Sequence, residues 1–150
     1  GRPGAAGVDA VIEYDLHRQW KVVAIEAEAL RLMAEGQFAL EGGRLDQVDS
    51  LIAAGLVAQK TEAPEFEGAG LLMRASGALT RHDVALADSL CERYGALVGP
   101  RSRYYGMKAA CYMYAGRLDD AAREVQMCLA LDPGDEVGVQ VRNALTSARR

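Results

Sequence analysis

The chain has 150 residues, of which half are hydrophobic but only 6% are aromatic, so a core must be built from Ala, Leu, Val and Met. This length suits one domain with a substantial buried core. The net charge of −4 and the dispersed basic residues argue against a nucleic-acid-binding protein, which would show a clustered basic face.

The sequence also shows no sign of a membrane or secretion segment. No apolar run approaches the ~20 residues that a membrane span needs, and no charged-then-apolar signal segment opens the chain. A cytoplasmic location is expected because three cysteines without close spacing fit a reducing compartment. The periplasm or a place within a larger protein stays open.

The first forty residues contain an irregular start and a long amphipathic pattern. Residues 1–7 are mostly Gly, Ala and Pro, so we expect a disordered start or the remnant of a tag. From Asp9 to Glu41, apolar residues recur at three- and four-residue steps, which predicts either one long N-terminal helix or two helices with a break near residues 15–18. A protruding first half would need a partner, which leaves open a homodimer through this helix. The apolar residues of the pattern are Val11, Ile12, Leu16, Trp20, Val23, Ala27, Leu30 and Ala34.

Further helices are predicted at about 46–58, 65–79, 83–97, 102–115 and 119–131, because the sequence is rich in Ala and Leu and has few β-branched runs. The segment at about 135–149 places Val137, Val141 and Leu145 on one face, which predicts a terminal capping helix. Linker-like breaks occur only at 61–64 and 99–100 and are short. Residues 8–150 are therefore predicted to form a single helical domain.

A turn sequence recurs along the chain. Gly43-Arg44-Leu45-Asp46-Gln47-Val48 closely matches Gly116-Arg117-Leu118-Asp119-Asp120-Ala121, and Thr80-Arg81-His82-Asp83-Val84-Ala85 is a degraded copy. With their arginines aligned, the three turns are 37 and 36 residues apart. In this alignment His82 takes the place of a leucine and is expected to be a packing substitute. Glycine at Gly43 and Gly116 suits the left-handed conformation that ends many helices.

The segment from Tyr105 to Pro133 resembles one complete unit of the tetratricopeptide repeat (TPR) family. Tyr105-x2-Lys108-Ala109-x2-Tyr112, then Ala121-x3-Val125, then Pro133 follow that family's spacing, with Lys108 where leucine is usual. Two upstream copies are degenerate. The resemblance implies an all-α, right-handed α-solenoid of about three helix–turn–helix repeats, at about 29–62, 66–99 and 102–135, with an N-terminal helix and a C-terminal capping helix.

The same resemblance implies a protein-interaction adaptor or scaffold that holds a peptide or helix of another protein in a concave groove. The partner segment is expected to be apolar, with an acidic group near Arg74 and Arg103. The groove-facing positions carried over from the family are Met33, Gln37, Leu40, Glu67, Gly70, Arg74, Gly77, Arg103, Gly106, Met107, Ala110 and Tyr114.

One subgroup of the family, which binds acidic chaperone tails, uses a clamp of Lys, Asn and Arg. Arg103 is compatible with that clamp. Its first lysine and asparagine slots hold Met33 and Gln37, its second asparagine slot holds Leu71, and its arginine slot holds Met107. The clamp is therefore not favoured.

Two other functions stay open. One is a narrower form of the adaptor, a secretion-type chaperone that dimerises through residues 8–20. The other belongs to a different class, a regulatory module cut from a larger protein. An enzyme is not expected, because no catalytic, cofactor-binding or metal-binding constellation is visible; His17 and His82 lack metal-site spacing. Cys91, Cys111 and Cys128 form no C-x-x-C pair. Cys111 and Cys128 are expected to be small buried hydrophobic residues. The alternative for these two is a Cys111–Cys128 bridge or thiol site.

Overall fold

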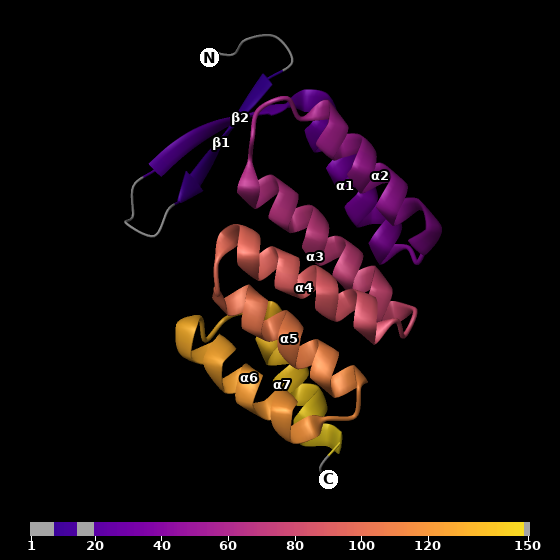
Figure 1. Cartoon of the computed structure of the whole chain (residues 1–150), viewed down its shortest axis with the longest axis vertical. Helices are drawn as coiled ribbons and strands as arrows, with labels where there is room; N and C mark the ends of the chain where they lie inside the picture. Colours follow the sequence, from indigo (N-terminus) through magenta and orange to yellow (C-terminus); the bar gives the residue numbers. More distant parts are fainter. Residues whose placement is uncertain (1–7, 15–19, 149–150) are drawn as a thin grey trace. The chain divides into compact units, whose positions relative to one another are not determined.

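The computed structural model describes residues 8–14 and 20–148. Two strands, β1 (Val8–Tyr14) and β2 (Trp20–Glu26), form an antiparallel hairpin in which Val8 pairs with Glu26 and Tyr14 with Trp20. The helices that follow are coloured along the chain in Figure 1. They are α1 (Ala27–Glu41), α2 (Leu45–Ala58), α3 (Pro64–Thr80), α4 (Val84–Val98), α5 (Ser102–Tyr114), α6 (Leu118–Leu131) and α7 (Glu136–Ala148).

The prediction of a helix over the whole of 9–41 is wrong in its first half. The structure has strands at Val8–Tyr14 and Trp20–Glu26, and the first helix begins only at Ala27. The physical reason is composition, because Val, Ile, Tyr and Trp dominate both strands, and such residues favour extended chain. The described residues before Ala27 are therefore extended, so the possible homodimer through an N-terminal helix loses the helix on which it was based. The expectations for residues 1–7 and for a break near 15–18 lie outside the described residues.

The chain divides into two compact units, residues 1–73 and 74–150, with α3 contributing to both. In the first unit, α1 and α2 pack as an antiparallel pair. Their close approach depends on the missing side chain of Gly55. A Cβ at this position would lie only 3.3 Å from the Ala29 carbonyl oxygen. The core of this unit is formed by Met33, Ala39, Val48, Ile52 and Met73.

In the second unit, α5 and α6 form the corresponding antiparallel pair, α4 packs on α5, and α7 packs on both α5 and α6. The buried residues that join them are small or medium-sized and include Ala109, Ala121, Val125, Cys128 and Val141. Helix bounds after residue 44 agree with the predicted ranges to within one or two residues.

The three turns share one backbone geometry. Gly43, His82 and Gly116 all have positive φ, at 76°, 61° and 79°. At each turn the next residue donates its N–H to the carbonyl of a residue five positions earlier: Arg44 to Ala39, Asp83 to Ala78 and Arg117 to Tyr112. A left-handed residue followed by this long hydrogen bond is characteristic of the Schellman motif, which ends many helices. The turn chemistry predicted for Gly43 and Gly116 is confirmed.

The predicted alignment of the middle turn is wrong by two residues. His82 occupies the left-handed position of the two glycines, and Val84 begins α4 where Leu45 and Leu118 begin α2 and α6. The equivalent residues are 39 and 34 residues apart. His82 is exposed rather than packed in the core, and its ring lies 6.0 Å from that of Tyr114.

Candidate functional site

A cavity of about 350 Å³ opens in the second unit among the end of α3, α5 and α7. Helices α3 and α5 are the first helices of successive hairpins, and α7 takes the same place after α6. The cavity is lined by Ser76, Leu79, Thr80, Met107, Ala110, Met113, Tyr114, Val137, Gln140, Val141 and Ala144.

The chemistry of this cavity is apolar with a few neutral polar groups. Leu79, Met107 and Val141 are nearly buried, whereas Tyr114 is 43% exposed. None of the described residues that line the cavity carries an acidic or basic side chain. The thioether side chains of Met107 and Met113 are flexible, so the wall can adapt to apolar groups of different shape.

The α5 wall follows from helical periodicity. Met107, Ala110 and Tyr114 are separated by three and four residues and therefore share one face of the helix. All three are predicted groove residues and all three line the cavity. Val137, Val141 and Ala144 are separated by four and three residues and share one face of α7 in the same way. Sequence reasoning did not assign the α7 residues to the groove because it treated that helix only as a cap.

Asp135 anchors the start of α7. Its side chain is 3% exposed. One oxygen accepts the N–H of Gly138 at 3.0 Å, and the other accepts Arg103 Nε at 3.1 Å and Ser102 Oγ at 3.3 Å. Burial works against the charge, but these hydrogen bonds outweigh it and lower the pKa of Asp135 below its ordinary value. The carboxylate thus ties the first turn of α7 to the first turn of α5.

The predicted groove residues are distributed over both units. Met33 is buried in the core of the first unit and Leu40 packs against it. Gln37 is exposed and donates to Glu41 at 2.9 Å, and Glu67 is exposed on α3.

In the second unit, Arg74 is half-buried on α3. Arg103 is bound to Asp135 and does not line the cavity. The cavity residues that the sequence did not indicate are Ser76, Leu79, Thr80, Met113, Val137, Gln140, Val141 and Ala144.

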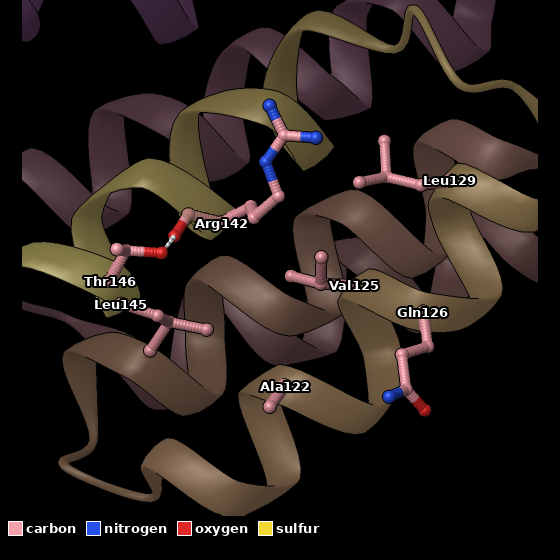
Figure 2. Close-up of a pocket in the computed structure, with 7 residues that line it drawn as sticks. All are labelled: Ala122, Val125, Gln126, Leu129, Arg142, Leu145 and Thr146. Atoms are coloured by element: carbon pink, nitrogen blue, oxygen red, sulfur yellow. Dashed lines mark hydrogen bonds between the residues drawn. The ribbon is translucent and has the colours of Figure 1, made fainter. Parts of the chain in front are cut away.

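A second cavity of about 330 Å³ lies between α6 and α7. Figure 2 shows Val125 of α6 and Leu145 of α7 pointing toward the space between the helices, with Arg142 at its edge. Thr146 donates its hydroxyl to the Arg142 carbonyl oxygen at 2.9 Å. This second cavity shares no lining residue with the first.

Lys108, the departure from the repeat pattern, links α5 to α4. Its ammonium nitrogen lies 2.5 Å from Asp88 and 3.0 Å from Glu92, and its side chain is only 12% exposed. Burial disfavours the charge, but the two carboxylates outweigh this effect and raise the pKa of Lys108. Tyr104 donates to Glu92 at 2.7 Å, and burial together with this hydrogen bond raises the pKa of Tyr104 to about 12.

Replacing Lys108 with leucine is expected to change the free energy of unfolding by less than about 1 kcal/mol. The leucine recovers apolar packing, and the half-exposed carboxylates of Asp88 and Glu92 return to water at little cost. Lys108→Ala is expected to cost about 1–2 kcal/mol, because the packing of the long side chain is lost as well. Urea unfolding of both variants tests this difference. Equal losses in the two variants would show that the ion pairs, not the packing, carry the contribution.

The described residues hold neither a metal-binding cluster nor a membrane-spanning helix. In the parts of the chain that the structure describes, no three His, Cys, Asp or Glu side chains are grouped so that they could hold a metal ion. Over the same residues, no helix is both long and apolar enough to cross a membrane.

Comparison with known proteins identifies the fold. No protein-family model matches the chain, and no curated protein matches it either. Among solved structures, the chain is similar to the first TPR of Spaghetti (RPAP3), in a structure bound to the HSP90 peptide SRMEEVD. The TM-score is 0.60 with 21% sequence identity, over 81% of this chain and 92% of the other. The predicted TPR-like helical-repeat fold is confirmed for the seven helices between Ala27 and Ala148, which the hairpin of β1 and β2 precedes.

Proposed function

We propose that this chain is a protein-interaction adaptor, and that its second unit holds an apolar peptide or helix of another protein between α3, α5 and α7. The main support for this proposal is that Met107, Ala110 and Tyr114 line one cavity. All three were assigned to the groove from the resemblance to the repeat family. The likeness to a TPR domain that was solved with a bound peptide supports it.

The chemistry of the lining favours apolar side chains in the partner. Leu79, Met107 and Val141 can bury them without leaving a charge unpaired. Thr80, Tyr114 and Gln140 offer hydroxyl and amide groups that can meet the backbone of an extended segment. Apolar pockets with a small number of polar groups are the usual composition of such recognition sites.

An acidic tail is a poorer occupant than an apolar segment. The similar TPR domain binds SRMEEVD, a peptide with three carboxylate side chains. In this chain Met107 stands in the cavity at the clamp's arginine slot, and Arg103 is already paired with Asp135. We therefore assign no acidic anchor to Arg103, and the cavity is proposed to select apolar side chains instead.

The test uses selection from a displayed library of random linear peptides. Selected peptides are expected to be rich in Leu, Met or Phe and to lose at least about tenfold in affinity with Ala144→Arg, because a guanidinium then enters the apolar cavity. Ala96→Arg is the matched control, since Ala96 is an exposed alanine on α4 away from the lining. It should bind as the unmodified protein does.

Synthetic SRMEEVD serves as the comparison peptide and is expected to bind more weakly than the selected peptides. Equal affinity of selected peptides for the Ala144→Arg and Ala96→Arg variants would place binding outside the cavity and refute the proposal. Preferential binding of SRMEEVD would show that the occupant is an acidic tail.

A further inference from the structure

The sulfur atoms of Cys91 on α4 and Cys111 on α5 lie 3.9 Å apart. Both residues are buried, with 0% and 3% of their surface exposed. The two sulfurs are not covalently bonded but lie within S–H···S hydrogen-bond distance, and a disulfide bond would shorten their separation to about 2.05 Å. The sequence pointed to Cys111 and Cys128 as the alternative pair, but the sulfur contact joins Cys111 to Cys91.

The surroundings distinguish the two thiols. Cys91 can donate a hydrogen bond to the sulfur of Cys111, and this bond lowers the pKa of Cys111 against the effect of burial. The same bond, together with burial, raises the pKa of Cys91. Lys108 favours ionisation of both thiols, whereas Asp88 opposes it. Glu92 also opposes ionisation of Cys111. These directions favour Cys111 as the thiolate and Cys91 as the hydrogen-bond donor.

We propose that Cys91 and Cys111 form an oxidisable thiol pair, which a hydroperoxide converts into a disulfide linking α4 to α5. The Cys111 thiolate attacks one peroxide oxygen, forming a sulfenic acid and releasing hydroxide. The Cys91 sulfur then attacks the sulfenic sulfur, and the S–O bond breaks as water leaves with the thiol proton. In total, two thiols lose two electrons and two protons, and hydrogen peroxide is reduced to two molecules of water.

The disulfide would fix a contact between the second and third hairpins that otherwise depends on packing and on the ion pairs of Lys108. It would close a loop between residues 20 positions apart in the sequence, which restricts the unfolded chain. Cys111 directly follows Ala110, which lines the α5 wall of the cavity. The covalent link therefore lies one residue from the proposed binding surface.

Cys128 provides an internal control. It is also fully buried, and burial, with the nearby carboxylate of Asp135, raises the pKa of its thiol to about 11. Its sulfur faces Gly106 and Gly138 rather than a second thiol. A reagent that merely reaches every buried cysteine would modify Cys128 too, whereas the proposed pairing leaves it reduced.

The experiment treats the folded protein with hydrogen peroxide, then alkylates it with N-ethylmaleimide under denaturing conditions for mass spectrometry. The expected product is a monomer that has lost two hydrogens, carries one alkyl group on Cys128, and yields a Cys91–Cys111 cross-linked peptide. Dithiothreitol should restore three alkylatable thiols. Cys128→Ala should cross-link as before, while Cys91→Ala should not, with circular dichroism confirming that both variants are helical.

Thermal unfolding gives a second readout, since the midpoint should rise by a few degrees on oxidation and return on reduction. Three alkylated cysteines after peroxide treatment, a cross-link that includes Cys128, or disulfide-linked dimers alone would each overturn the proposal.

Discussion

Replacing Asp135 with alanine is expected to lower the free energy of unfolding by about 3 kcal/mol. The buried carboxylate accepts hydrogen bonds from Gly138 N–H, Arg103 and Ser102. Alanine removes the N-cap of α7 and leaves the partly buried guanidinium of Arg103 without its counter-ion. Urea unfolding followed by circular dichroism measures the loss.

Asp135→Asn separates the contribution of the cap from that of the charge. Asparagine caps a helix about as well as aspartate, so this variant should lose only about 1 kcal/mol, from the ion pair with Arg103. Losses of equal size in the two variants would show that the charge dominates. A loss below about 1 kcal/mol in Asp135→Ala would show that α7 does not depend on this anchor.

The anchor also predicts a pH dependence. The pKa of Asp135 is lower in the folded protein than in the unfolded chain, where it is about 3.9. The stabilisation is therefore fully present above the unfolded value and is lost as the pH falls through the folded one. The difference in stability between the unmodified protein and Asp135→Asn should be constant above about pH 5 and shrink below about pH 4.

Local chemistry explains which parts of the fold were predictable from the sequence. Gly43 and Gly116 marked helix ends because glycine readily adopts positive φ, and the structure has it at both. The middle turn was misaligned because His82 takes the same conformation without the glycine that would have identified it. At the N-terminus, apolar spacing suggested a helix, although the β-branched and aromatic composition of both strands favoured extended chain.

In the candidate site, too, some residues were predictable from the sequence and others were not. The α5 face was predictable because the repeat pattern is strongest from Tyr105 to Pro133, which fixes the register of Met107, Ala110 and Tyr114. The role of Arg103 was not predictable, because its partner Asp135 lies 32 residues further along the chain. No local pattern reports a contact at that separation, so the ion pair of this groove-facing arginine could not be predicted from the sequence.

The second large effect on the free energy of unfolding is expected where α7 packs closely against α6. A Cβ added at Gly138 would lie 2.6 Å from Cys128 Sγ and 2.9 Å from Leu129 Cδ2. Gly138→Ala is therefore expected to cost about 2 kcal/mol, because overpacking outweighs the helix propensity gained. Gly134→Ala is the matched control: its Cβ would meet only Asp132 Oδ1, at 3.6 Å, so a change within about 0.5 kcal/mol is expected.

The clash at Gly138 should be relieved by a second substitution. Cys128→Ala removes the sulfur, and the Cys128 Cβ that remains would lie at an ordinary contact distance of 3.5 Å from the new methyl group. The double variant should therefore lose at least about 1 kcal/mol less than the sum of the two single variants in urea unfolding. Strict additivity would mean that Leu129, and not Cys128, limits the approach.

Because Val137 and Val141 on α7 line the cavity, Gly138→Ala should also weaken binding of selected peptides, and the double variant should restore it.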